Sequence, residues 1–134
     1  MSQTDDILAR WYSALKAGDM AAFREIAAPD IMVRWNGPPD LVPWAGEHHG
    51  VEAVLAFFGK VGAALEVLGV EPVERLVTDD KALIVLKGHW RVRATGQELY
   101  LRAANLFSFR DGQVAAYEVF PDSAAFARAL GSVA

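Results

Sequence analysis

Residues 81–121 read KALIVLKGHWRVRATGQELYLRAANLFSFRDGQVAAYEVFP. Aliphatic, aromatic and β-branched side chains alternate with polar ones along most of this stretch, which is typical of β-strands. Two dipeptides interrupt the alternation, Thr95-Gly96 and Asp111-Gly112, and both are of the kind found in tight hairpin turns. The segment therefore predicts three long antiparallel strands that follow one another as a meander.

The alternation assigns the side chains of these strands to two faces. One face is almost entirely apolar and carries Leu86, Gly88, Trp90, Val92, Leu99, Leu101, Ala103, Asn105, Phe107 and Phe109. The other face is basic and mixed, with Lys87, His89, Arg91, Arg93, Tyr100, Arg102 and Leu106. We expect the apolar face to lie against helices, with the carboxamide of Asn105 in the middle of it.

The pairing within the meander depends on the length of each turn. If Thr95-Gly96 is a two-residue loop, Trp90 pairs with Leu101, Leu86 pairs with Asn105, and Gly88 lies opposite Ala103. These two small residues would leave a dip beside the large Trp90 ring, either filled by a helix side chain or left open. We expect an open cavity there.

The second turn allows two registers, which place Glu118 on opposite faces. A two-residue loop puts Glu118 across from Asn105. A three-residue loop, with Gly112 left-handed, puts Tyr117 across from Asn105, brings Val119 to the apolar face and turns Glu118 outward near Arg102. An ionised glutamate among aromatic rings would be costly without a partner, so we expect the three-residue loop.

The rest of the chain predicts mainly helices. Ile7, Leu8, Trp11, Ala14 and Leu15 form one apolar stripe of a first helix that ends at Gly18. The other expected elements are a short helix capped by Asp19 and ended by Pro29, a strand over Ile31–Trp35, a helix from Gly50, and a strand over Val70–Thr78 whose Pro72 indicates a sheet edge. Residues 1–134 thus predict a single α+β domain.

Composition narrows the classes of function. The formal charge of −4 argues against a nucleic-acid partner, and the absence of cysteine excludes disulfides and thiolate chemistry. A hydrophobic fraction of 53% suggests a lined cavity or a subunit interface in addition to the core. The N-terminal residues lack the features of a signal peptide and the longest aliphatic run, Ala82–Leu86, is too short to span a bilayer. We expect a cytoplasmic protein with no membrane partner.

The order of these elements resembles the nuclear transport factor 2-like superfamily, and more closely its SnoaL-like and ketosteroid-isomerase-like branch. The resemblance covers residues 4–130 and rests on Ala17-Gly18-Asp19, Pro29-Asp30, Asp111-Gly112 and Asp122 with the elements between them. It implies a cone-shaped fold: a strongly curved antiparallel sheet wrapped around three N-terminal helices, with a short C-terminal helix. It also implies a deep pocket and often a dimer through the outer sheet face.

The catalytic residues of the branch do not carry over. Ketosteroid isomerases use a tyrosine, an aspartate base and a protonated aspartic acid, and the corresponding positions here are Trp11, Trp35 and Asn105. Limonene epoxide hydrolases and SnoaL-type cyclases need an acid in the last strand, where this chain has Val119. The resemblance therefore implies the fold of the branch without the acids of these three mechanisms.

Asn105 is the strongest candidate for chemistry. It would donate to a carbonyl or enolate oxygen of a ligand, with Tyr117 as a second donor; the alternative is a core carboxamide bonded to Tyr117 or to a helix backbone. His48, rather than His49, would be the general base, and both histidines could instead simply shape the loop before the third helix. His89 is expected to be structural. Three histidines without cysteine predict neither a metal site nor a cofactor.

Further residues are expected to line the ligand site. These are Trp11, Arg34, Trp35, Asn36, Trp44, Leu86, Trp90, Leu101, Ala103, Phe107 and Val119. The tryptophans have ordinary core packing as their alternative role. The expected ligand is an apolar small molecule. A homodimer is expected through the outer sheet face, formed by Arg91, Tyr100, Arg102, Leu106, Glu118 and Phe120.

Three readings of function follow from this pattern. The first is a SnoaL-like or ketosteroid-isomerase-like pocket protein that acts on a hydrophobic carbonyl compound, as an isomerase, cyclase or lyase. The second is a ligand-binding module without catalysis, consistent with the missing acids. The third is a dimeric interaction or scaffold domain with a packed interior.

Overall fold

A computed structural model describes residues 3–132 of the chain. The helices are α1 (Gln3–Ala17), α2 (Met20–Ile26), α3 (Val51–Ala64) and α4 (Ser123–Ala129). The strands are β1 (Ala27–Trp35), β2 (Gly46–His49), β3 (Leu65–Val77), β4 (Lys81–Val92), β5 (Glu98–Arg110) and β6 (Gln113–Phe120). The fold is α+β, as the sequence predicts.

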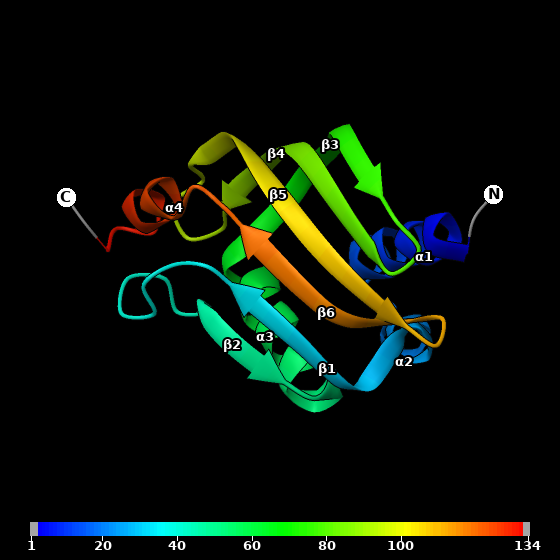
Figure 1. Cartoon of the computed structure of the whole chain (residues 1–134). Coiled ribbons are helices and arrows are strands. Elements are labelled where there is room, and N and C mark those ends of the chain that lie inside the picture. Colours follow the sequence, from blue (N-terminus) through cyan, green and yellow to red (C-terminus); the bar gives the residue numbers. More distant parts are fainter. Residues whose placement is uncertain (1–2, 133–134) are drawn as a thin grey trace.

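The strands form one curved six-stranded sheet in the order β2-β1-β6-β5-β4-β3. Strand β1 runs parallel to β6, and the other neighbouring pairs are antiparallel. Figure 1 shows α1, α2 and α3 together behind the sheet, and α4 beyond the end where β6 finishes. The sheet therefore has an inner face covered by helices and an outer face that no described helix covers.

The first two helices form where the sequence predicts, for the expected reasons. The stripe of α1 is buried through Ile7, Leu8, Trp11 and Ala14. Asp19 caps α2, its side chain accepting a hydrogen bond from the Ala22 N–H at 3.1 Å. Helix α2 ends at Ile26, before Pro29, and β1 starts at Ala27, four residues earlier than expected. Pro29 lies within β1, where the pairing with β6 is irregular between Ala27 and Met32.

The first hairpin differs from the expected two-residue loop. Trp90 pairs with Leu99 and Ile84 with Asn105, so each partner lies two residues away from the predicted one. The Gly96 N–H instead bonds to the Val92 carbonyl and the Val92 N–H to the Gln97 carbonyl, both at 2.8 Å. A two-residue type I′ turn needs positive φ at both positions, which a β-branched threonine resists. A shift of two residues leaves the assignment of side chains to faces unchanged.

The second hairpin also differs in its loop. Asp111 and Gly112 have φ values of 54° and 75°, which gives a two-residue turn rather than the expected three-residue one. An irregularity between Ser108 and Phe109 then shifts the register, so Asn105 lies opposite Val119 instead of Tyr117. Glu118 nevertheless lies on the outer face and Val119 on the inner face, as expected. The bulge, rather than the loop length, produces this result.

The predicted dip beside Trp90 is filled. Gly88 pairs with Leu101 rather than lying opposite Ala103. The Trp90 indole lies over Gly88, since a Cβ atom built on that glycine would be 2.0 Å from Cη2 of the ring. The open cavity expected above these small residues is therefore occupied by a side chain of the same strand, not by a helix.

The two outermost strands position further candidate residues. Strand β2 pairs with β1 and carries His48 and His49, which the sequence analysis placed in a loop. Strand β3 lies at the opposite edge, as Pro72 indicated, but it begins at Leu65. Its pairing with β4 is irregular between Val67 and Gly69 and between Pro72 and Glu74. These bulges and the proline make β3 a poor template for pairing with another strand.

Candidate functional site

Asn105 lies on the inner face of β5 and is only 4% exposed. Its Nδ2 atom donates a hydrogen bond to the hydroxyl oxygen of Tyr12 at 2.9 Å. The partner is thus a side chain of α1, neither the Tyr117 hydroxyl nor a helix backbone group. Because the Tyr12 oxygen accepts this bond, the Tyr12 proton is available for another acceptor. Asn105 on the sheet thus donates to Tyr12 on α1, and the Tyr12 hydroxyl can donate in turn to a further acceptor.

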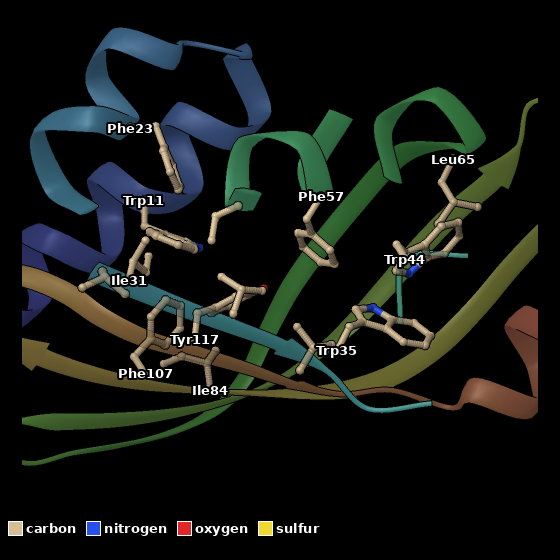
Figure 2. Close-up of a cluster of buried hydrophobic side chains, with 14 of the residues drawn as sticks. Trp11, Phe23, Ile31, Trp35, Trp44, Phe57, Leu65, Ile84, Phe107 and Tyr117 are labelled. Atoms are coloured by element: carbon tan, nitrogen blue, oxygen red, sulfur yellow. The ribbon is translucent and has the colours of Figure 1, made fainter. Parts of the chain in front are cut away.

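Aromatic rings surround this pair, and we call them the inner cluster: Trp11, Tyr12, Phe23, Phe58, Phe107 and Tyr117. The Trp11 ring centroid lies 4.9 Å from that of Tyr117 and 5.0 Å from that of Phe23. Figure 2 shows Trp11 on α1 above the sheet residues Phe107 and Tyr117. The inner cluster surrounds Asn105, which is buried, whereas Tyr12 at its edge is half-buried.

Burial changes the acidity of both tyrosines. It raises the pKa of Tyr12 to about 12, while the Asn105 hydrogen bond opposes the rise. It raises the pKa of Tyr117 well above its ordinary value; the nearby Tyr12 phenol raises it further, and the nearby Trp11 indole N–H opposes the rise. No hydrogen bond of standard geometry joins the Trp11 nitrogen to a partner among the described residues. Both phenols therefore stay protonated at neutral pH and serve as donors.

A second group of rings, the outer cluster, lies towards α4 and consists of Trp35, Trp44, Trp90 and Phe126. The Trp35 centroid is 5.8 Å from that of Trp44 and 5.6 Å from that of Phe126. Trp44 is 1% exposed, and its indole nitrogen has no hydrogen-bond partner among the described residues. Figure 2 shows Phe57 of α3 between the two clusters.

The two histidines of β2 differ in orientation. His48 pairs with the buried Val33, and its ring centroid lies 4.7 Å from that of Phe57 with the two rings tilted, so His48 faces the inner side. Its Nε2 lies 2.9 Å from the Trp44 carbonyl oxygen. A carbonyl only accepts, so this nitrogen carries a proton and cannot act as a base while the bond holds. His49 is exposed beside Glu47. Catalysis by His48 stays a prediction.

Arg34 and Asn36 belong to a polar network on the outer side of the sheet. Arg34 bonds to Glu47 through Nε at 3.0 Å and to Glu118 at 3.4 Å, and Asn36 Nδ2 donates to Glu118 at 3.0 Å. Glu118 is thus bound by Arg34 and Asn36, not by Arg102, which pairs with Lys87 further along β5. The expected role of Arg34 and Asn36 as pocket wall stays a prediction.

The remaining predicted wall residues lie on the inner face of β4, β5 and β6. Leu86, Phe107 and Val119 are buried, whereas Leu101 and Ala103 are half-buried. Two open hollows among the described residues lie elsewhere. One, of about 200 Å³, lies between Pro38, Leu41 and α4, and the other, of about 410 Å³, lies between α1 and α2. An open pocket over Asn105 stays a prediction.

Among residues 3–132, no three histidine, cysteine or acidic side chains lie close enough to hold a metal ion. None of the helices in that range is both long and apolar enough to cross a bilayer.

Tyr12 is the residue that sequence reasoning missed. The alignment on Ala17-Gly18-Asp19 put Trp11 at the tyrosine position of ketosteroid isomerases, one residue away. Leu8, Tyr12 and Leu15 are spaced by four and three residues, so Tyr12 lies at the half-buried edge of the apolar stripe of α1. That spacing was the available signal. Phe57 of α3, which is buried together with Val54, was not singled out from the sequence either.

Comparison with known proteins identifies relatives of this arrangement. The sequence model of the SnoaL-like domain family matches residues 8–117. No curated protein sequence matches the chain.

Solved structures share the fold along almost the whole chain. A candidate isomerase from Rhodopseudomonas palustris has a TM-score of 0.86 and 18% identity, covering 95% of this chain and 97% of that one. A nuclear transport factor 2-like protein from Burkholderia xenovorans LB400 has a TM-score of 0.85 and 25% identity, covering 95% of both chains. A candidate SnoaL-like polyketide cyclase from Jannaschia sp. CCS1 has a TM-score of 0.80 and 19% identity, covering 98% and 94%.

Proposed function

This chain belongs to the SnoaL-like domain family, and on that premise we propose that it binds a hydrophobic carbonyl compound and polarises its carbonyl oxygen. The bound molecule would lie between the inner face of the sheet and the helices, near Tyr12 and Asn105. The neighbours named as isomerase and polyketide cyclase support a small-molecule role of this general kind. The identity of the compound is open.

The observation that carries this proposal is the buried hydrogen bond from Asn105 to Tyr12. Burying a carboxamide and a phenol among aromatic rings is costly unless both are hydrogen-bonded. The bond leaves the Tyr12 hydroxyl proton unused, and the raised pKa of that hydroxyl keeps the proton in place. A donor of this kind hydrogen-bonds to a carbonyl oxygen and stabilises the negative charge that develops on that oxygen when an enolate forms.

Polarisation of a carbonyl is the step that isomerases, cyclases and lyases of carbonyl compounds share. Tyr12 would donate to the oxygen directly, Asn105 would hold the Tyr12 hydroxyl, and Tyr117 would be a second donor. A complete proton transfer also needs a base. His48 is the candidate on the inner side, and it would act through Nδ1 or after releasing the Trp44 carbonyl.

The proposal is tested by turnover and binding of hydrophobic ketones. Asn105→Ala and Tyr12→Phe should each reduce turnover of an accepted ketone by about tenfold to a thousandfold, the range for removing an oxyanion donor. Tyr100→Phe is the matched control because Tyr100 is 73% exposed on the outer face. Full activity of both inner variants on an identified substrate would contradict the assignment.

A second candidate function is binding without catalysis. Val119 and Trp35 stand where relatives of known mechanism carry acids, and both are buried and apolar. Without those acids the donors would hold a ligand and leave it unchanged. Calorimetric binding of a ketone with no product after prolonged incubation would favour this candidate, and any catalysed conversion would exclude it.

We also propose a two-fold homodimer through the outer face of the sheet. Leu76, Leu83 and Leu106 are cross-strand neighbours and form one apolar row across that face. Leu76 is 70% and Phe120 44% exposed in the single chain. Arg91, Tyr100 and Arg102 lie further along the same face of β4 and β5 and have side chains that subunit interfaces favour. An interaction or scaffold role would use this face alone.

A further inference from the structure

We propose that four exposed charges on the outer face of the sheet decide which chain this protein accepts as its partner. These charges, which we call the charge set, are Glu71, Glu74, Lys87 and Arg102. In the homodimer, the acids of one copy pair with the bases of the other. This inference rests on the proposed homodimer and specifies its partner, a second copy with complementary charges at these positions.

The charge set differs from its charged neighbours because it has no partner within the chain. Arg91, on the same face, donates from Nε to Glu66 at 3.2 Å. Within residues 3–132, no side chain of the charge set takes part in a hydrogen bond or an ion pair. Lys87 and Arg102 are also cross-strand partners, and like charges directly opposite each other are destabilising. Acids supplied by a second copy would remove this repulsion.

The charge set has a direction across the sheet. Glu71 pairs with Lys87, and Lys87 pairs with Arg102, so this row runs from an acid on β3 to a base on β5. Glu74 lies in the next row of the same face, opposite Val85. Figure 1 shows β3, β4 and β5 side by side at one edge of the sheet. The β3 side of this surface is therefore acidic and the β5 side basic.

A two-fold axis that runs along β4 matches this pattern. It places β3 of one copy over β5 of the other, with Glu71 over the partner's Arg102 and Leu76 over the partner's Leu106. The two Lys87 side chains, one from each copy, then lie between the two Glu71 side chains. An axis across the strands would instead place β3 over β3, where the outer positions hold acids and no base.

The test exchanges the charges in two double variants of the whole chain. The acidic variant combines Lys87→Glu with Arg102→Glu, and the basic variant combines Glu71→Lys with Glu74→Lys. In each variant alone, like charges face like charges. We therefore expect the dissociation constant of the dimer, measured by light scattering on dilution, to rise about tenfold to hundredfold.

Mixing the two variants tests whether the charges face each other. Every position of the charge set then lies opposite a charge of the other sign, so a mixed dimer should form where each variant alone dissociates. Native mass spectrometry identifies the mixed dimer, because the two chains differ in mass. Added salt should weaken it, since the charges are exposed. Circular dichroism checks that both variants keep the fold.

A control variant separates position from net charge. Lys16→Glu with Lys60→Glu changes the net charge by the same amount as the acidic variant does. Both lysines are exposed, on α1 and α3, away from the outer face. This control should dimerise as tightly as the unmodified protein. Equal dissociation of the control and the acidic variant would overturn the role of the charge set.

The remaining outcomes distinguish this inference from the proposed homodimer. If the unmodified protein and both variants dimerise equally well, the charge set does not select the partner, and the homodimer stands. If the variants separate but do not associate on mixing, the charges do not face each other and the axis along β4 is wrong. If the unmodified protein has the mass of one chain, the homodimer is itself refuted.

Discussion

Asn105 in the sheet and Tyr12 in the helix layer each provide the other with a hydrogen-bond partner. Asn105 comes from β5 and Tyr12 from α1, 93 residues apart in sequence, yet they share a bond of 2.9 Å in the interior. Removing one partner leaves the other buried and less well satisfied. Removing both takes away that penalty. The bond therefore ties the helix layer to the sheet and prepares Tyr12 as a donor.

The energetic coupling of this pair can be measured. Asn105→Ala should lower the free energy of unfolding by about 1–3 kcal/mol, because it leaves the Tyr12 hydroxyl unpaired and a small void. The double variant with Tyr12→Phe should lose less than the sum of the two single variants, by about 1 kcal/mol. Urea unfolding of the four proteins gives this difference. Strict additivity would show that the two groups do not interact.

Tyr12 also predicts a stability change at high pH. Its pKa is about 12 in the folded protein, above the ordinary value of 10.0. The folded state then holds a proton that the unfolded state releases, so this contribution is constant below pH 10. It should decline by about 1.4 kcal/mol per pH unit between pH 10 and pH 12. Urea unfolding at pH 9 and pH 11 measures the decline.

Phenylalanine variants isolate the contribution of Tyr12. Tyr12→Phe should lose less stability between the two pH values than the unmodified protein does. Tyr100→Phe should behave like the unmodified protein, since Tyr100 is 73% exposed. An identical pH dependence in all three proteins would exclude Tyr12 as the source. Deprotonation of lysine side chains affects all three equally.

At the scale of single elements, the hairpins show where sequence reasoning succeeds and fails. Periodicity alone assigned the faces of β4 and β5, because a strand alternates strictly. It could not give the pairing, since that depends on the φ values that the turn residues adopt. Asp111 accepts a φ of 54° and Thr95 does not. The bulge that turns Glu118 outward has no local sequence signal. Glu118 was assigned to the outer face only because burying an ionised glutamate among aromatic rings costs free energy.

The candidate site was predictable to a similar degree. Asn105 stood out as a carboxamide within an apolar strand face, and the structure buries it. Its partner did not stand out, because pairing between α1 and β5 depends on how the layers pack and not on local sequence. The same limit applies to Trp90, whose ring lies on its own strand. A sequence indicates which small residues could leave space, but not which large one fills it.

The Gly88–Trp90 contact gives a prediction for strand β4. A Cβ at Gly88 would lie 2.0 Å from the Trp90 ring, so Gly88→Ala should displace the indole and cost about 1–3 kcal/mol of stability. Gly69→Ala on β3 is the matched control, because nothing lies within 4 Å of its Cβ position. Urea unfolding and the tryptophan emission maximum report both effects. Equal behaviour of the two variants would contradict the contact.

At the scale of the whole molecule, the outer face of the sheet is the surface proposed for the homodimer. Its apolar row of Leu76, Leu83 and Leu106 crosses strands β3, β4 and β5. We predict that light scattering at micromolar concentration gives about twice the 14.6 kDa of one chain. Burial of the row would drive association, since exposed apolar patches of this kind mark interfaces.

A charge placed in the row should separate the subunits. Leu106→Arg should shift the mass towards that of one chain at the same concentration, whereas Lys16→Arg on α1, away from this face, should leave it unchanged. Circular dichroism checks that both variants keep the fold. A mass of one chain for the unmodified protein would refute the dimer.

The Trp90 ring fills the space above Gly88, so a side chain of the protein itself occupies this part of the inner face. Because the indole is tethered to the site, its local concentration is fixed, and dilution never removes it. Any ligand that needs the space above Gly88 must compete with the Trp90 ring. Its observed affinity is then its intrinsic affinity multiplied by the fraction of molecules in which the ring has moved aside. Guests that fit beside the ring escape this competition. A ligand of the kind proposed would therefore be selected by its size as well as by its polar groups, with the Trp90 side chain setting the size limit.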